Sequence, residues 1–294
     1  MWRLQPPIDF AQGQIDDDSA LPLTMNPAEF PNIARSHERL WWYRGMEAIA
    51  LDQLRQATSG RQVARVLEAG CGTGHFALAA QCAFGWNVMP WDLSPTALAY
   101  ARRLGLQHLT TADIRALPVR PESVDVLLCL DVLAHLDPEQ NAETIRGFAQ
   151  ALRPGGLLML RVSALQILRS RHSQFVCERQ RFRRGQLRQL MQEAGLRIHR
   201  LTYLNALLFP VALVKFRIWE PLTQAPPASG VTLPAPWLNR FLSWPLQIER
   251  RLLAAGFNLP IGQSLLAIAE KPATRPASLQ TDELQSGAPE LAGR

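Results

Sequence analysis

The sequence predicts an α/β fold in which a mainly parallel sheet carries helices on both faces. Strand-length apolar runs alternate with helical patterns between residues 63 and 163. These strand candidates are apolar runs rather than alternating patterns, which is typical of parallel strands covered on both sides. A glycine-rich turn at Gly70–Gly74 follows the first of them and precedes a helix.

The expected elements alternate in order along the chain. An apolar stripe at helical spacing predicts the first helix, and Ser94 followed by Pro95 is a good start for the third. The expected helices are His37–Ala57, Phe76–Phe84, Thr96–Leu104, Pro138–Leu152 and Arg184–Ala194. The expected strands are Val63–Glu68, Asn87–Trp91, Leu106–Thr111, Val124–Leu130, Leu157–Val162, Leu196–Leu204 and Ser264–Glu270.

About sixty residues separate the last two expected strands, far more than a hairpin needs. They hold an apolar segment (Leu207–Trp219), a Pro-rich linker (Pro221–Pro236) and an amphipathic stripe, in which Pro245 is expected to break or restart the helix. The stripe is formed by Trp237, Phe241, Trp244, Ile248 and Leu252. We therefore expect an irregular lead-in at 1–36, a core at 37–204, a helical insertion or lid at 205–262, the last core strand at 263–271 and a disordered tail at 272–294.

The insertion has two interpretations at this stage. In one, it covers a binding site and also touches a membrane surface, because a basic segment precedes its apolar residues. In the other, both apolar segments pack against the sheet and bury everything. The first twenty residues lack an apolar core, which predicts a cytoplasmic protein without a signal peptide, and peripheral membrane contact stays open.

Charge and cysteine content limit the classes of function. The net charge is +6, and residues 161–200 hold ten Arg and two Glu, so the basicity is local. That segment is a solvated face, a site for an anionic or lipid-linked substrate, or a nucleic-acid contact. Its few aromatic residues disfavour the last of these. The four cysteines lack metal-ligand spacing, so we expect reduced cysteines and no metal site.

The glycine-rich turn carries the chemical signal. It reads E-x-G-x-G-x-G from Glu68 to Gly74. A dinucleotide fingerprint needs a third glycine where His75 stands, and a P-loop needs a lysine that is absent. The pattern resembles the first motif of class I S-adenosylmethionine-dependent methyltransferases.

Further segments resemble this family in the same order. They are Asp92 at the end of the second strand, Thr111–Ile114, Asp131–Leu136 after the fourth strand and Leu152–Gly156. The stretch Trp41–Gly45 is similar to that of the subgroup related to quinone-biosynthesis (methyltransferase domain type 11-like) enzymes. The resemblance implies a Rossmann-like, seven-stranded, mainly parallel sheet with helices on both faces and with the insertion before the last strand. It also makes residues 37–204 an S-adenosylmethionine-binding core.

The resemblance assigns the methyl donor to a set of residues at the carboxyl edge of the sheet. Asp92 would accept the ribose hydroxyls, Asp113 would meet the adenine amine, and Arg44 would pair with the methionine carboxylate. The aromatic residues beside Arg44 have the alternative role of capping the sheet's core. The full set expected to bind S-adenosylmethionine is Glu68, Gly70, Cys71, Gly72, Gly74, Asp92, Leu93, Asp113, Ile114, Asp131, Tyr43 and Arg44.

The resemblance implies methyl transfer to an oxygen or carbon of a small, lipid-linked or other apolar acceptor. His135, just past the fourth strand, is the candidate general base, and orienting the loop is its alternative role. Two rival functions stay open: a methyl-donor-binding module without catalysis, and a nucleic-acid methyltransferase. The latter more often has an Asn/Asp-Pro-Pro-aromatic turn, which Asp131–Ala134 lacks. The sequence leaves the acceptor and the oligomeric state undefined.

Overall fold

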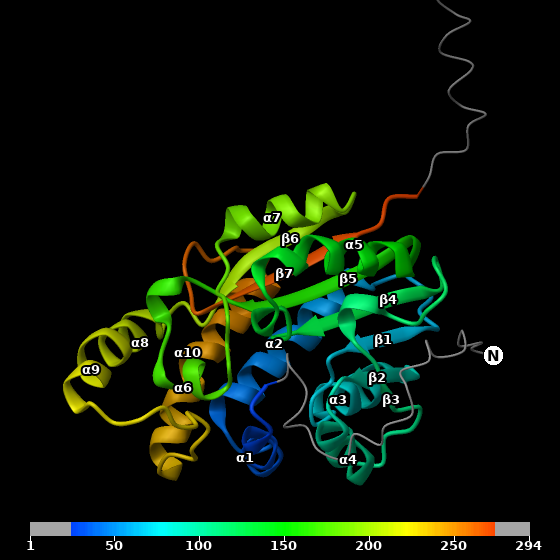
Figure 1. The fold of residues 1–294 in the computed structure, drawn as a ribbon. Coiled ribbons are helices and arrows are strands. Elements are labelled where there is room, and N and C mark those ends of the chain that lie inside the picture. Colours follow the sequence, from blue (N-terminus) through cyan, green and yellow to red (C-terminus); the bar gives the residue numbers. More distant parts are fainter. Residues whose placement is uncertain (1–24, 274–294) are drawn as a thin grey trace, which may run out of the picture.

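A computed structural model describes residues 25–273 as a seven-stranded sheet with helices on both faces (Figure 1). The strand order is β3-β2-β1-β4-β5-β7-β6; the first five strands are parallel, and β7 runs antiparallel to both of its neighbours. The strands are β1 (Val66–Ala69), β2 (Val88–Asp92), β3 (Thr110–Thr111), β4 (Val124–Leu130), β5 (Leu152–Ser163), β6 (Arg197–Leu204) and β7 (Ser264–Glu270). The predicted fold class is confirmed.

The helices cover the two faces of the sheet in separate groups. Figure 1 shows α5 and α7 over one face and α2 with α10 over the other. The α-helices are α1 (Phe30–Ser36), α2 (Trp41–Ala57), α3 (His75–Phe84), α4 (Pro95–Arg103), α5 (Asn141–Ala151), α6 (Arg171–Phe175), α7 (Arg184–Glu193), α8 (Phe209–Val214), α9 (Glu220–Thr223) and α10 (Pro236–Ala254). The expected cap of α4 is present, since the Ser94 hydroxyl accepts the Ala97 amide at 3.1 Å.

Several boundaries differ from the expected ones. Residues 30–36 form helix α1 within the expected irregular lead-in. Strand β3 has two residues because Leu106 instead closes helix α4, with its amide donating to Ala101 at 3.3 Å. Strand β5 begins at Leu152, so the Gly155–Gly156 turn lies within it as a register shift against β4. The expectations for residues 1–24 and 274–294 lie outside the described residues.

Pro245 lies inside one continuous helix, so the expected break in α10 is wrong. The helix packs against α2 through the buried Leu246 and Leu253. Gly45 lets the two helices approach closely, because a Cβ there would collide with the Leu246 side chain. This packing after Pro245, with the hydrogen bond that Asn239 accepts from the Trp41 amide before it, outweighs the local cost of a proline in a helix interior.

The insertion does not bury its apolar residues. Helix α8 continues into the π-helical segment η7 (Lys215–Trp219) and then into α9. Large apolar side chains on these helices and on α10 are exposed, among them Trp219, Trp237 and Trp244. The interpretation in which both segments pack wholly against the sheet is therefore wrong. Among residues 25–273, none of the helices combines the length and the apolarity needed to cross a membrane.

Candidate functional site

A cavity of about 810 Å³ lies at the carboxyl edge of the parallel strands, the usual place for ligands in open α/β sheets. The glycine-rich turn and the ends of β2 and β4 form one part of its wall. The segment after β5, helices α8 and α9, and the loop at 225–234 form the rest. This volume accommodates a ligand of drug-like size.

The glycine-rich turn has three glycines in the left-handed region, at Gly70 (φ 81°), Gly72 (φ 54°) and Gly74 (φ 82°). A Cβ on Gly72 would meet no atom within 4 Å, because this glycine faces open space in the cavity. A Cβ on Gly74 would instead lie 2.6 Å from Leu106 and 2.7 Å from Ala101. Gly70, Cys71 and Gly72 line the cavity, whereas Gly74 is needed for packing.

Asp92, at the end of β2, holds the turn in place. One carboxylate oxygen accepts the Gly72 amide at 2.7 Å, and the other accepts the Ser94 amide at 2.9 Å. Asp92 and Leu93 both line the cavity. A carboxylate in the wall of a cavity can accept hydrogen bonds from ligand hydroxyl groups.

Glu68 is a buried acid in the wall of this cavity. It accepts the backbone amide of Ala77, while its Oε2 atom has no hydrogen-bond partner among the described residues. Burial, followed by the nearby Asp92 charge, raises the pKa of Glu68 to about 8. A buried polar atom without a partner is costly, and a cationic donor on a ligand would satisfy it.

Asp131 pairs with an arginine that the sequence analysis did not assign. The Arg161 guanidinium lies 2.7 Å from the Asp131 carboxylate and also packs over the Trp42 ring at 5.6 Å. Arg161 lines the cavity, whereas Arg44 is exposed and does not. The expected pairing of Arg44 with the methionine carboxylate stays a prediction; Trp41, Trp42 and Tyr43 are the residues of α2 that line the cavity beside it.

Two histidines and Tyr43 form an aromatic stack beside the glycine-rich turn. The His37 ring stacks on His75 at 4.2 Å and on Tyr43 at 4.9 Å. Burial, the nearby His75 and Arg161 lower the pKa of His37 to about 3, so His37 is neutral at physiological pH. Neither histidine has a role that its sequence spacing indicates, since that spacing carries no motif.

His135 lies in the 3₁₀ turn η4 (Leu133–His135) and lines the cavity. One ring nitrogen donates to the backbone of Cys177, and Nδ1 has no partner among the described residues. Burial lowers the pKa of His135 despite that hydrogen bond. The imidazole is therefore neutral with Nδ1 unprotonated, which is the state that a general base requires.

Asp113 and Ile114 line the cavity beyond β3. Asp113 accepts the Arg115 amide at 2.9 Å and binds the Arg115 side chain through both of its oxygens. These contacts fix the direction of the turn that carries Ile114.

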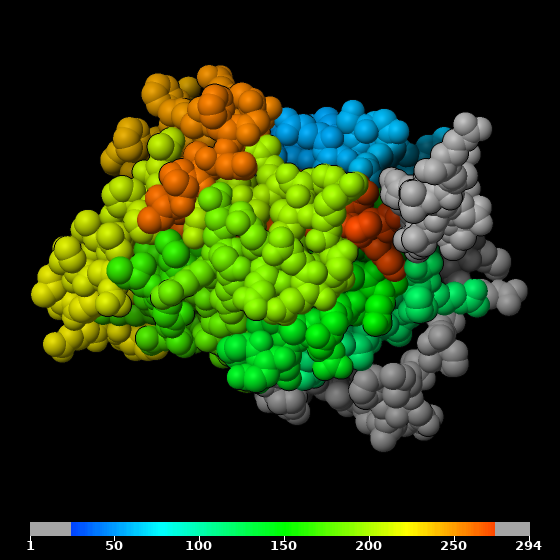
Figure 2. Space-filling view, turned by 90° about the horizontal axis from the view of Figure 1, so that it is seen from above, coloured from blue at the N-terminus to red at the C-terminus, as the bar shows by residue number. Residues whose placement is uncertain are grey.

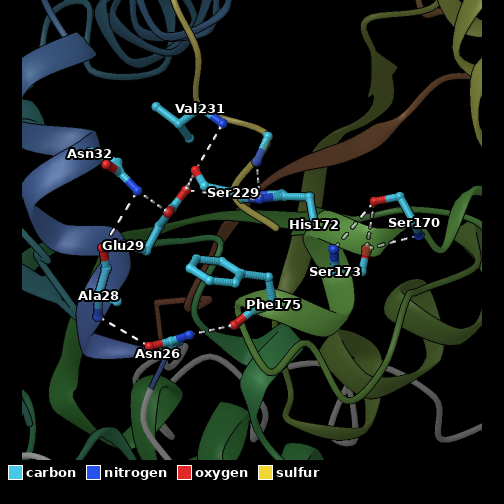
Figure 3. Close-up of polar contacts among 11 residues, drawn as sticks. Asn26, Ala28, Glu29, Asn32, Ser170, His172, Ser173, Phe175, Ser229 and Val231 are labelled. Atoms are coloured by element: carbon cyan, nitrogen blue, oxygen red, sulfur yellow. Dashed lines mark hydrogen bonds and ion pairs between the residues drawn. The ribbon is translucent and has the colours of Figure 1, made fainter. Parts of the chain in front are cut away.

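A hydrogen-bond network closes the cavity on the side of the insertion (Figure 3). The buried Glu29, just before α1, accepts from the side-chain amide of Asn32 at 2.9 Å and from the Ser229 hydroxyl at 2.9 Å. His172 on α6 accepts the Gly230 amide at 2.9 Å. Three segments that are far apart in the sequence therefore meet over the cavity.

The basic segment is largely engaged within the protein. Glu178 accepts Arg181 at 3.0 Å; burial opposes its ionisation, but this guanidinium and nearby serine hydroxyls lower the pKa of Glu178 overall. Further arginines of residues 161–200 pair with carboxylates, namely Arg161 with Asp131, Arg179 with Asp137 and Arg197 with Glu270. Between residues 25 and 273, no group of three or more His, Cys, Asp and Glu side chains is placed to hold a metal ion.

Comparison with known proteins gives a family match that includes the glycine-rich turn, and several curated relatives. A family model described as "Methyltransferase domain" matches residues 66–156. The chain is 34% identical over 122 residues to the probable S-adenosylmethionine-dependent methyltransferase Rv3030 of Mycobacterium tuberculosis, covering 41% of this chain and 42% of the relative. It is 38% identical over 109 residues to the malonyl-[acyl-carrier protein] O-methyltransferase of Pectobacterium atrosepticum, covering 36% and 40%. The chain thus spans about two fifths of the length of the curated relatives it matches.

Solved structures share the fold at low sequence identity. One is a chain from the complex between the Haloferax volcanii Trm112 methyltransferase activator and a methyltransferase, with a TM-score of 0.52 and 16% identity, covering 85% of this chain and 96% of that one. Another is the [4+2]-cyclase SpnF, with a TM-score of 0.50 and 18% identity, covering 77% and 82%. These likenesses confirm the sheet and helix arrangement.

Proposed function

We propose that this chain is a class I S-adenosylmethionine-dependent methyltransferase that transfers the methyl group of S-adenosylmethionine to an oxygen or carbon of an apolar, lipid-linked acceptor, a proposal supported by the match to a methyltransferase domain and to methyltransferase relatives. One observation carries the proposal. The partnerless Oε2 of Glu68, the carboxylate of Asp92 and the open face of Gly72 border the same cavity. S-adenosylmethionine presents cationic groups and ribose hydroxyl groups, and its binding requires close approach to the protein backbone.

The residues present fit the donor molecule. Asp92 would accept the ribose hydroxyls, Asp113 and Ile114 would hold the adenine, and Glu68 would face the ammonium group. Arg161 would be a cation at the methionine end, beside Tyr43 and the stacked histidines. S-adenosylmethionine supplies an electrophilic methyl group on a positively charged sulfur. The task of the protein is to place an acceptor atom in line with that group.

The other half of the cavity would hold the acceptor. Leu208, Val211, Ala212 and Phe216 line it from the insertion, which favours an apolar chain. His135 would take the proton from an acceptor hydroxyl or acidic carbon. In this proposal residues 205–262 act as a lid and touch a membrane surface, from which a lipid-linked acceptor would come.

The relatives that are malonyl-[acyl-carrier protein] O-methyltransferases suggest a different acceptor, a carboxylate on a carrier protein. A carboxylate is already ionised at neutral pH and needs no general base. The unpartnered Nδ1 of His135 is the observation that favours an acceptor with a proton to lose.

The test uses the purified protein with methyl-labelled S-adenosylmethionine and two fractions of a bacterial extract, the lipid extract and the soluble one. We expect label in an organic-soluble product, and none with Asp92→Ala. Label in the soluble fraction alone would overturn the lipid-linked acceptor. Calorimetry with S-adenosylhomocysteine measures donor binding separately, and binding without a labelled product in either fraction would favour a module without catalysis.

A further inference from the structure

Exposed apolar side chains are concentrated in the insertion. Among the described residues, Ile167 is the one large apolar side chain of comparable exposure outside residues 205–262. Inside it they are Leu207, Val211, Val214, Ile218, Trp219, Leu222, Leu233, Trp237, Phe241, Trp244, Ile248, Phe257 and Ile261. Scattered exposed apolar residues are ordinary, but a concentration of this kind marks an interaction surface.

Helix α10 holds four of them on one face. Trp237, Phe241, Trp244 and Ile248 follow one another at steps of four, three and four residues, and their exposed fractions are 72%, 65%, 67% and 45%. The opposite face of α10 is anchored on α2 through the buried Leu246 and Leu253. The helix is therefore fixed in place with its apolar stripe turned outward.

Helices α8 and α9, with the η7 segment between them, add a second exposed group at the same end of the molecule. Val214, Ile218, Trp219 and Leu222 are each more than half exposed. Figure 1 shows α8 and α9 beside α10 at the end remote from β3, and the space-filling view again places the yellow and orange segments at one end (Figure 2). We call these four side chains, together with the four of α10, the apolar end.

The charges around the apolar end are positive. The insertion has five basic residues, all exposed: Lys215, Arg217, Arg240, Arg250 and Arg251. Of these, Arg250 pairs with Asp52 on α2. Its two acids are occupied elsewhere, because Glu249 is buried beneath α10 and Glu220 accepts from Arg171. Outward positive charge beside exposed tryptophans is the combination that favours an anionic lipid surface, since Trp prefers the headgroup level and Arg meets the phosphates.

We propose that the apolar end docks on an anionic phospholipid bilayer. The same helices connect that surface to the cavity, because Ala212, Phe216 and Leu242 line the cavity from α8, η7 and α10. An apolar acceptor would therefore pass from the bilayer along helices that are apolar on both sides. Docking itself is independent of catalysis; the delivery of an acceptor rests on the proposed function.

The test is flotation of the full-length protein with vesicles, without methyl donor or acceptor. The vesicles are phosphatidylcholine alone or an equimolar mixture with phosphatidylglycerol. We expect flotation with the anionic vesicles, weakening as salt rises. The triple variant Trp237→Ser, Phe241→Ser, Trp244→Ser should stay at the bottom, and Arg240→Glu should float at least about fivefold less. These positions are exposed, so the variants should melt like the parent chain.

Two matched controls isolate the surface. Ile167→Ser removes an exposed apolar side chain outside the insertion, and Arg188→Glu reverses an exposed charge on α7; both should float like the parent. The proposal is overturned if the parent chain does not float at low salt, or if the triple variant floats equally. It is also overturned if sedimentation shows a dimer that the triple variant alone dissociates. S-adenosylhomocysteine binding, measured on the same preparations, reports separately on the proposed function.

Discussion

Glu68 keeps a carboxyl group buried where the fold satisfies only one of its oxygens. Because its pKa rises from 4.5 to about 8, the folded chain holds a proton between these values that the unfolded chain releases. Stability therefore falls as pH rises through this window, by a few kcal/mol in total. Glu68→Gln should abolish this fall and raise the melting temperature at pH 8.

Thermal melts of the ligand-free protein at pH 5 and pH 8 check this. Glu139→Gln changes an exposed acid and should keep the parent's fall in melting temperature between pH 5 and pH 8. The same Glu68→Gln protein should bind S-adenosylmethionine more weakly, because glutamine, unlike Glu68, cannot lose a proton to become a carboxylate beside the ammonium group. An unchanged slope together with unchanged binding would mean that Glu68 is only a structural acid.

Asp92 connects the turn to the donor. Asp92→Asn keeps the shape of the side chain but removes the charge, and we expect S-adenosylhomocysteine affinity to fall by about 1.5–3 kcal/mol. Glu139→Gln is the control, because it removes an exposed carboxylate that does not line the cavity. Calorimetry showing equal affinity for the parent and a folded Asp92→Asn protein would remove Asp92 from the site.

His135 should show its role in the pH dependence of turnover. Burial lowers its pKa, so the base form persists below pH 6.5, and activity should fall only as pH drops through that lowered value. His135→Gln should lower kcat by a factor of about 10²–10⁴ and should abolish the fall in activity at low pH. A variant with near-parent turnover and the same profile would point to a carboxylate acceptor and a structural histidine.

At the scale of elements, the glycine-rich turn separates binding from packing. Gly74→Ala places a methyl group against Leu106 and Ala101 at a φ of 82°, so we expect a loss of about 2–3 kcal/mol in unfolding free energy. Gly72→Ala meets no neighbour and should cost about 1 kcal/mol from its backbone angle alone. Its methyl group enters the cavity, so S-adenosylhomocysteine binding should weaken.

Denaturant unfolding and calorimetry on the two variants check the pair. We expect Gly74→Ala to lose more unfolding free energy, and Gly72→Ala to lose relatively more affinity for S-adenosylhomocysteine. The reverse pattern would show that Gly74, not Gly72, faces the donor.

The elements also show what the sequence could predict. Strands β4 and β7 match their expected bounds, because long apolar runs between turn residues are unambiguous. The motif residues from Glu68 to His135 line the cavity, apart from Gly74. They meet there because β1, β2, β3 and β4 are adjacent parallel strands, so the loops that follow them lie at the same edge of the sheet. Arg161 could not be found, because it lies inside a strand and meets Asp131 only in the folded sheet. The continuity of α10 through Pro245 likewise depends on packing against α2.

At the scale of the whole molecule, the cavity is closed by segments that the chain brings together from three distant places. The hydroxyl of Ser229, in the loop before α10, donates to Glu29 and accepts the Val231 amide at 3.1 Å. The Gly230 amide donates to His172. These amides are protected by side chains rather than by a helix or strand, so their hydrogen exchange reports directly on opening of the cover.

If residues 205–262 act as a lid, the donor product should slow that opening, because a ligand that contacts both the sheet edge and the cover stabilises the closed form. We expect saturating S-adenosylhomocysteine to slow amide exchange across residues 225–232. Ser229→Ala removes a hydrogen bond to a buried carboxylate and should speed exchange there about tenfold. Ser243→Ala, on the exposed part of α10, is the control and should leave it unchanged. Exchange that responds to neither the ligand nor Ser229→Ala would mean that the insertion is a fixed wall, and that the acceptor enters by another route.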